Sequence, residues 1–99
     1  MARGNEVFAP SDVAEGFAAL ADQVDRRAPD ATLLAAMQAV ARSCARRAAQ
    51  ERSPERKRLL TDVQTALQTW QEVWPRLGRQ PEFRLAVARE ARGWATRFS

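Results

Sequence analysis

The chain has 99 residues, of which 45% are hydrophobic, so its length and composition fit one folded domain with a single modest core. It has no histidine and one cysteine, which excludes catalytic triads that use histidine, histidine-based zinc and di-iron sites, and an internal disulfide. The formal net charge is +4 and no apolar run is long enough for a membrane span, so we expect a cytoplasmic, bacterial protein without metal, cofactor or catalytic activity.

Residues 1–10 are expected to be a flexible N-terminal segment, and residues 11–99 a single domain. Ser11 is a good N-cap for a first helix that extends to about Arg27. The apolar stripe of this helix comprises Val13, Phe17, Leu20 and Val24. Its opposite face is acidic, as is usual for a solvated surface.

A second helix begins with Asp30 as its N-cap and extends through Ala48. Its apolar residues follow steps of three and four and are Leu33, Met37, Val40, Cys44 and Ala48. This phase places the Cys44 thiol in the core as a small hydrophobic group. Arg42 and Arg46 are expected on the opposite, solvated face.

A third helix has the clearest start, because Ser53 can cap it and Pro54 suits the first helical position. Its apolar residues form a heptad seam typical of helix packing: Leu60, Val63, Leu67, Trp70, Trp74 and Leu77. Pro75 predicts that the helix ends or kinks at Trp74.

A fourth helix begins at Pro81 and presents one apolar face, formed by Phe83, Val87, Ala91, Trp94 and Phe98. Gly93 lies inside this helix, where glycine costs about 1 kcal/mol relative to alanine. We therefore expect another helix to cross closely at Gly93.

Four amphipathic helices joined by short connections predict an all-α fold, a small antiparallel four-helix bundle with up-down-up-down topology. An alternative is a homodimer formed through the third and fourth helices, because the seam and the three tryptophans would suit an interface between copies.

The corner between the second and third helices is rich in basic residues. Residues 1–30 hold six acids and three arginines, whereas residues 31–99 hold thirteen bases and six acids. The candidate partner-binding or anion-binding residues at the corner are Arg42, Arg46, Arg47, Arg52, Arg56, Lys57 and Arg58. Arg47 and Arg56 are phased to converge over the open end of the core. A secondary basic face on the fourth helix comprises Arg84, Arg89 and Arg92.

Two functions fit this pattern, beside the simpler interpretation that the corner is only a solvated surface. The first is a non-catalytic protein–protein interaction or regulatory module, whose partner is an acidic protein surface or a second copy of the chain. The alternative is a nonspecific nucleic-acid-binding protein that uses the same arginines, although no recognition motif is present. An arginine-lined enzyme site would need Arg47, Arg56 and a carboxylate in one buried concave site.

Overall fold

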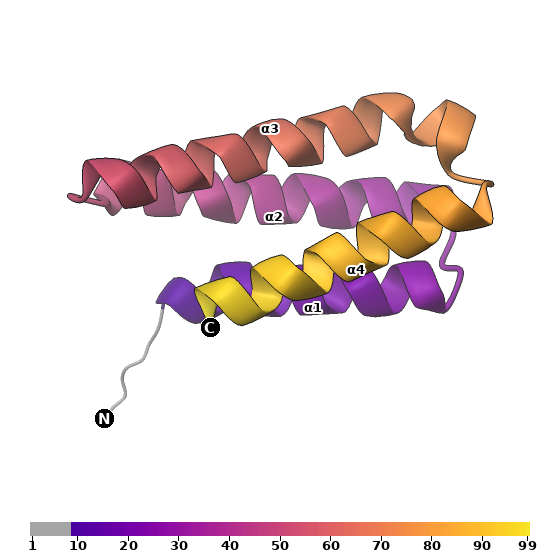
Figure 1. Ribbon diagram of the computed structural model, residues 1–99, viewed down its shortest axis with the longest axis horizontal. Helices are drawn as coiled ribbons and strands as arrows, with labels where there is room; N and C mark the ends of the chain where they lie inside the picture. The colour runs from indigo at the N-terminus through magenta and orange to yellow at the C-terminus, as the bar shows by residue number, and fades with distance from the viewer. Residues whose placement is uncertain (1–8) are drawn as a thin grey trace.

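The computed structural model describes residues 9–99, and side chains from Asp12 onward. In this part of the chain the secondary structure is entirely helical (Figure 1). The helices are α1 (Ala9–Asp25), α2 (Asp30–Gln50), α3 (Pro54–Leu77) and α4 (Pro81–Phe98). The all-helical prediction is confirmed. The expectation for residues 1–10 falls mainly on residues 1–8, which lie outside the described part.

The helices pack side by side into a compact bundle in which α1 contacts both α2 and α4 extensively, and α2 contacts α1 and α3. Contact between α3 and α4 is much smaller. Figure 1 shows the α1–α2 and α3–α4 connections at one end, and the α2–α3 corner together with the last turn of α4 at the other. The basic corner therefore lies at the same end of the molecule as the end of α4.

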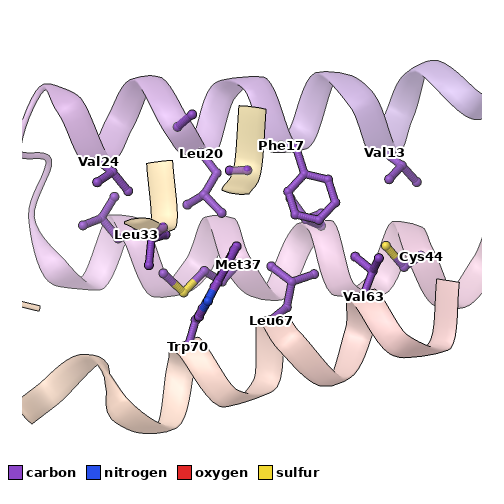
Figure 2. Close-up of a cluster of buried hydrophobic side chains, with 14 of the residues drawn as sticks. Val13, Phe17, Leu20, Val24, Leu33, Met37, Cys44, Val63, Leu67 and Trp70 are labelled. Atoms are coloured by element: carbon purple, nitrogen blue, oxygen red, sulfur yellow. The ribbon is translucent and has the colours of Figure 1, made fainter. Parts of the chain in front are cut away.

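The core consists of the apolar stripes that the helical periodicity predicts. Phe17, Leu33, Met37 and Leu67 are fully buried, and Figure 2 shows side chains from α1, α2 and α3 meeting in one cluster. On α3 the predicted seam is buried from Leu60 to Trp74, inside the same chain. On α4 the buried residues are Val87, Ala88 and Ala91, whereas the predicted core aromatics Phe83, Trp94 and Phe98 are only half-buried.

The bounds of α1 and the start of α2 differ from the predictions, because the N-cap of α2 is Pro29 and Asp30 lies within the helix. α1 begins at Ala9, so Ser11 lies within the helix, and it ends at Asp25. Its end is a Schellman turn: Arg27 adopts a left-handed backbone (φ 58°), Arg27 N donates to Val24 O at 3.1 Å, and Ala28 N donates to Gln23 O at 3.0 Å. α3 continues through Pro75 to Leu77, and Figure 1 shows its last turn departing from the axis of the rest.

The expected close crossing at Gly93 is wrong. A Cβ atom built on Gly93 would meet no neighbour within 4 Å, and the residue is exposed. The close approach occurs instead at Gly16 on α1, where a Cβ atom would lie 2.8 Å from Val40 Cγ2 on α2. Rotation of α4 about its axis turns Gly93 to solvent, while Ala88 and Ala91 face the neighbouring helices.

Candidate anion-binding site

The corner between α2 and α3 is built by the three residues Glu51, Arg52 and Ser53. Ser53 caps α3 as predicted, because its Oγ accepts a hydrogen bond from Arg56 N at 3.4 Å, and Pro54 follows at the first helical position. The Glu51 carboxylate accepts a hydrogen bond from Ser53 N at 3.3 Å. Among the described residues it forms no ion pair with Arg47. The carboxylate of Glu51 therefore bonds to the backbone of the turn and not to a neighbouring arginine.

The seven basic residues of the corner surround this turn. The side chains of six are exposed: Arg42, Arg46, Arg52, Arg56, Lys57 and Arg58. Arg47 is half-buried, as its position on the flank of the α2 stripe requires. Among the described residues, none of the seven forms an ion pair with an acidic side chain; the described pairs join Arg92 to Asp22 and Asp25. The corner therefore concentrates positive charge that nearby acids do not neutralise by direct contact.

A cavity of about 330 Å³ lies beside the corner, where the start of α3 and the end of α4 stand apart. Arg47 from α2 and Arg56 from α3 both line it, so the structure brings together the two arginines whose phase was unusual. The last turn of α4 adds Arg97, and the remaining lining residues are Val13, Glu51, Leu59, Leu60, Phe98 and Ser99. We call this the corner cavity.

Arg47 is the least solvated charge of the corner cavity. Its Nη1 atom is buried and has no hydrogen-bond partner among the described residues. Buried N–H groups of a guanidinium are normally satisfied, because removing them from water without an acceptor costs free energy.

The apolar wall of the corner cavity is aromatic and well packed. The Phe98 ring stacks on Phe17 at 6.4 Å between ring centroids and on Trp94 at 6.1 Å. The Arg97 guanidinium lies 5.7 Å from the centre of the Trp94 ring, in a cation–π contact. These contacts connect the cavity wall to the core and place a fluorescent indole next to it.

Arg97, Phe98 and Val13 were not identified as site residues from the sequence. Arg97 resembles any other exposed arginine on a C-terminal turn, and only the return of α4 to the α2–α3 corner brings it to the cavity. The predicted up-down-up-down topology contains a signal for Arg97, because it places the end of the fourth helix at the α2–α3 corner.

The secondary basic face does not form one free surface. Arg84 is half-buried, and its guanidinium donates to Gly78 O at 2.8 Å and to Val24 O at 2.9 Å. Arg92 pairs with Asp25 and lies 3.6 Å from Asp22, and the hydrogen bond that it donates to Asp25 raises the pKa of Arg92. Only Arg89 is exposed without either kind of contact in the described chain. The sequence pattern grouped three arginines that the fold uses in three different ways.

Two other candidate features lie apart from the corner cavity. Leu85 is the one exposed large hydrophobic side chain of the described residues, at 57% exposure, but it lies in the first half of α4. A shallow hollow between α1 and α2 has Asp12, Glu15 and Arg46 on its edges and small residues on its floor. Neither feature shares a residue with the corner cavity, because Arg46 belongs to the basic corner but does not line the cavity.

The described residues contain no group of three or more histidine, cysteine, aspartate or glutamate side chains that could hold a metal ion. No helix among them has the length and apolar content to cross a membrane. The Cys44 thiol is fully buried, and burial raises its pKa to about 11. It is therefore protonated at neutral pH and lacks the thiolate that nucleophilic chemistry requires.

No protein-family model, no curated protein and no solved structure matches this chain. The corner cavity and the arginines around it are the features that a proposed function has to explain.

Proposed function

We propose that this protein is a non-catalytic interaction module whose basic α2–α3 corner binds an acidic surface of a partner protein. The observation that carries the proposal is the cluster of six exposed bases at the corner, none of them ion-paired with a described acid. A complementary acidic surface would be attracted over several ångströms and held in register by forked guanidinium–carboxylate contacts.

A non-catalytic role is supported by the chemistry of the side chains near the corner cavity. The concave site with Arg47, Arg56 and a carboxylate exists, but it is open to solvent at the exposed Arg56. Its Glu51 carboxylate already accepts a backbone hydrogen bond, and with no histidine in the chain the site lacks a dedicated proton carrier. Arginines alone can hold an anion, and binding is the function they support best.

We also propose how the four helices run relative to one another. Short connections and the positions of the helix ends support an antiparallel, up-down-up-down bundle. A dimer through α3 has less support, because Leu67 and Trp70 of its seam pack inside the chain. A bacterial, cytoplasmic location stays a prediction.

Nucleic-acid binding is the less favoured alternative. A basic surface that follows a phosphate backbone would have to extend beyond the corner, and the fold uses Arg84 and Arg92 for internal contacts. The seven bases of the corner are grouped around the single turn between α2 and α3. This geometry suits a local acidic patch better than a long polyanion.

The test replaces two exposed arginines that do not line the corner cavity. We expect Arg52→Glu with Arg58→Glu to keep the helical circular dichroism signal and to weaken binding of a captured, identified partner at least roughly tenfold, or about 1.4 kcal/mol, by calorimetry. The control is Arg76→Glu with Arg89→Glu, which makes the same charge change at exposed positions elsewhere. Equal losses in both variants would show that net charge, not the corner, governs binding.

A second measurement distinguishes the alternative. Fluorescence anisotropy of a labelled 20-mer DNA duplex and of a single-stranded RNA is recorded at about 50 and about 200 mM salt. Strong binding that falls by orders of magnitude between the two salts, and that the corner variant removes, would replace the protein-partner proposal with the nucleic-acid one.

A further inference from the structure

We infer that the corner cavity binds a small amphipathic carboxylate. Its carboxylate would lie on Arg47 and Arg56, and its apolar part against Leu59, Leu60 and Phe98. This inference goes beyond the proposed function, because it concerns a low-molecular-weight ligand and needs no protein partner.

The charge balance of the corner cavity favours an anionic ligand. Three guanidiniums, from Arg47, Arg56 and Arg97, stand around the cavity with the Glu51 carboxylate. Glu51 Oε1 is occupied by Ser53 N, so the carboxylate is held at the turn. A carboxylate matches the planar fork of a guanidinium, and unlike inorganic phosphate it can carry an apolar chain that contacts the apolar wall of the cavity.

The Arg47 guanidinium supplies the specific contact. Its Nη1 is shielded from solvent and has no acceptor among the described residues, although the same side chain lines the cavity. A carboxylate that draws the guanidinium toward the cavity would satisfy a donor that the fold leaves unpaired. This is the feature that separates Arg47 from the exposed arginines of the corner, which water can satisfy.

The size and the wall of the corner cavity favour a ligand with an apolar part. A volume of about 330 Å³ is at the lower end of the range for small-molecule sites. Leu60 is buried, Leu59 and Phe98 are half-buried, and the Phe98 ring is fixed by stacking on Phe17. Each methylene that such a wall removes from water is expected to improve affinity roughly fourfold.

Octanoate is the first probe, with acetate, octanol and inorganic phosphate as comparisons, all below the concentrations at which octanoate forms micelles. Binding is followed by calorimetry and by tryptophan fluorescence, because the Trp94 indole stacks on Phe98 in the cavity wall. We expect octanoate to bind at least roughly tenfold more tightly than acetate, octanol or phosphate, and to change the fluorescence.

Arg47→Gln is expected to weaken octanoate binding by about tenfold or more, whereas the matched variant Arg52→Gln, at an exposed arginine that does not line the cavity, leaves it unchanged. If Arg47→Gln disturbs folding, Arg97→Gln on the exposed last turn of α4 provides the same comparison.

The comparison probes have outcomes that would contradict the inference. If octanol bound as tightly as octanoate, the site would be an apolar hollow with no specific contact for a carboxylate. If acetate or phosphate bound as tightly as octanoate, the site would attract anions without using its apolar wall. If no probe bound, the inference would be wrong. None of these outcomes bears on the protein-partner assay, whose variants lie outside the cavity.

Discussion

The indole Nε1 of Trp74 donates a hydrogen bond of 3.1 Å to Asp30 Oδ1, joining the last turns of α3 to the first residue of α2. Trp74 is 2% exposed, so its N–H has little access to water and depends on this acceptor. Asp30 makes no side-chain capping bond; the residue before α2 is Pro29, which has no capping side chain. Asp30, which the sequence predicts as an N-cap, instead accepts a hydrogen bond that joins α2 to α3.

Asp30→Ala is expected to lower the free energy of unfolding by about 1–3 kcal/mol, because it leaves the buried Trp74 N–H without a partner and removes an acid from the first turn of α2. Asp30→Asn keeps an oxygen acceptor at the same place and should cost clearly less. Urea unfolding followed by circular dichroism measures both. Equal losses would mean that the charge at the helix start matters and the indole contact does not.

Arg84 completes the same end of the bundle. Its guanidinium lies 5.3 Å from the centre of the Trp74 ring and donates to the carbonyl oxygens of Val24 and Gly78, at the ends of α1 and α3. Arg84→Lys keeps the charge but not the planar fork, and we expect it to lower the free energy of unfolding by about 1–2 kcal/mol. Arg89→Lys, at an exposed position of the same helix, should stay within about 0.5 kcal/mol of the wild type. A neutral result for Arg84→Lys would show that a single ammonium contact suffices.

The local features of this protein could be predicted from the sequence because short-range patterns determine them. The heptad spacing on α3 identifies Leu67 and Trp70 as core residues, and Ser53 with Pro54 identifies the start of the helix. These signals depend on residues within one or two turns of each other.

The roles of the charged residues could not be read in the same way, because they depend on which helix ends meet. Arg84 and Arg89 have the same chemistry and the same helix, yet one spans two helix ends and the other is solvated. Arg97 reaches the corner cavity only because α4 ends beside the α2–α3 corner. Rotation and placement of whole helices decide these contacts.

The two glycines within helices give a matched pair of substitutions. Gly16→Ala places a methyl group 2.8 Å from Val40 Cγ2, closer than two carbon atoms normally approach, so we expect a loss of about 1–3 kcal/mol despite the better helix propensity of alanine. Gly93→Ala meets no neighbour and should gain up to about 1 kcal/mol. Thermal unfolding of the two variants should therefore shift in opposite directions. Stabilisation by both would show that α1 and α2 can separate slightly at no cost.

The left-handed residue after α1 offers a stabilising change. Arg27 has φ 58°, a conformation that glycine adopts without the steric penalty of a Cβ atom. Arg27 is exposed, so Arg27→Gly removes little packing and is expected to raise the melting temperature, corresponding to about 0.5–1 kcal/mol. Arg26→Gly, one residue earlier, is the control and should destabilise or have no effect. A lower melting temperature for Arg27→Gly would mean that the arginine side chain stabilises the turn.

The buried thiol predicts a loss of stability in alkali. The pKa of Cys44 is about 11 in the folded protein and 9.0 for an unperturbed thiol, so below pH 9 both states hold the proton and the thiol adds no pH dependence. Between these values the unfolded chain loses the proton while the folded chain keeps it, and the free energy of unfolding falls as pH rises. Cys44→Ala should lack this part of the decline. A thiol reagent should correspondingly react slowly with the native protein at neutral pH and rapidly in urea. Rapid native reaction, or identical alkaline profiles for the two proteins, would contradict a thiol held protonated inside the core.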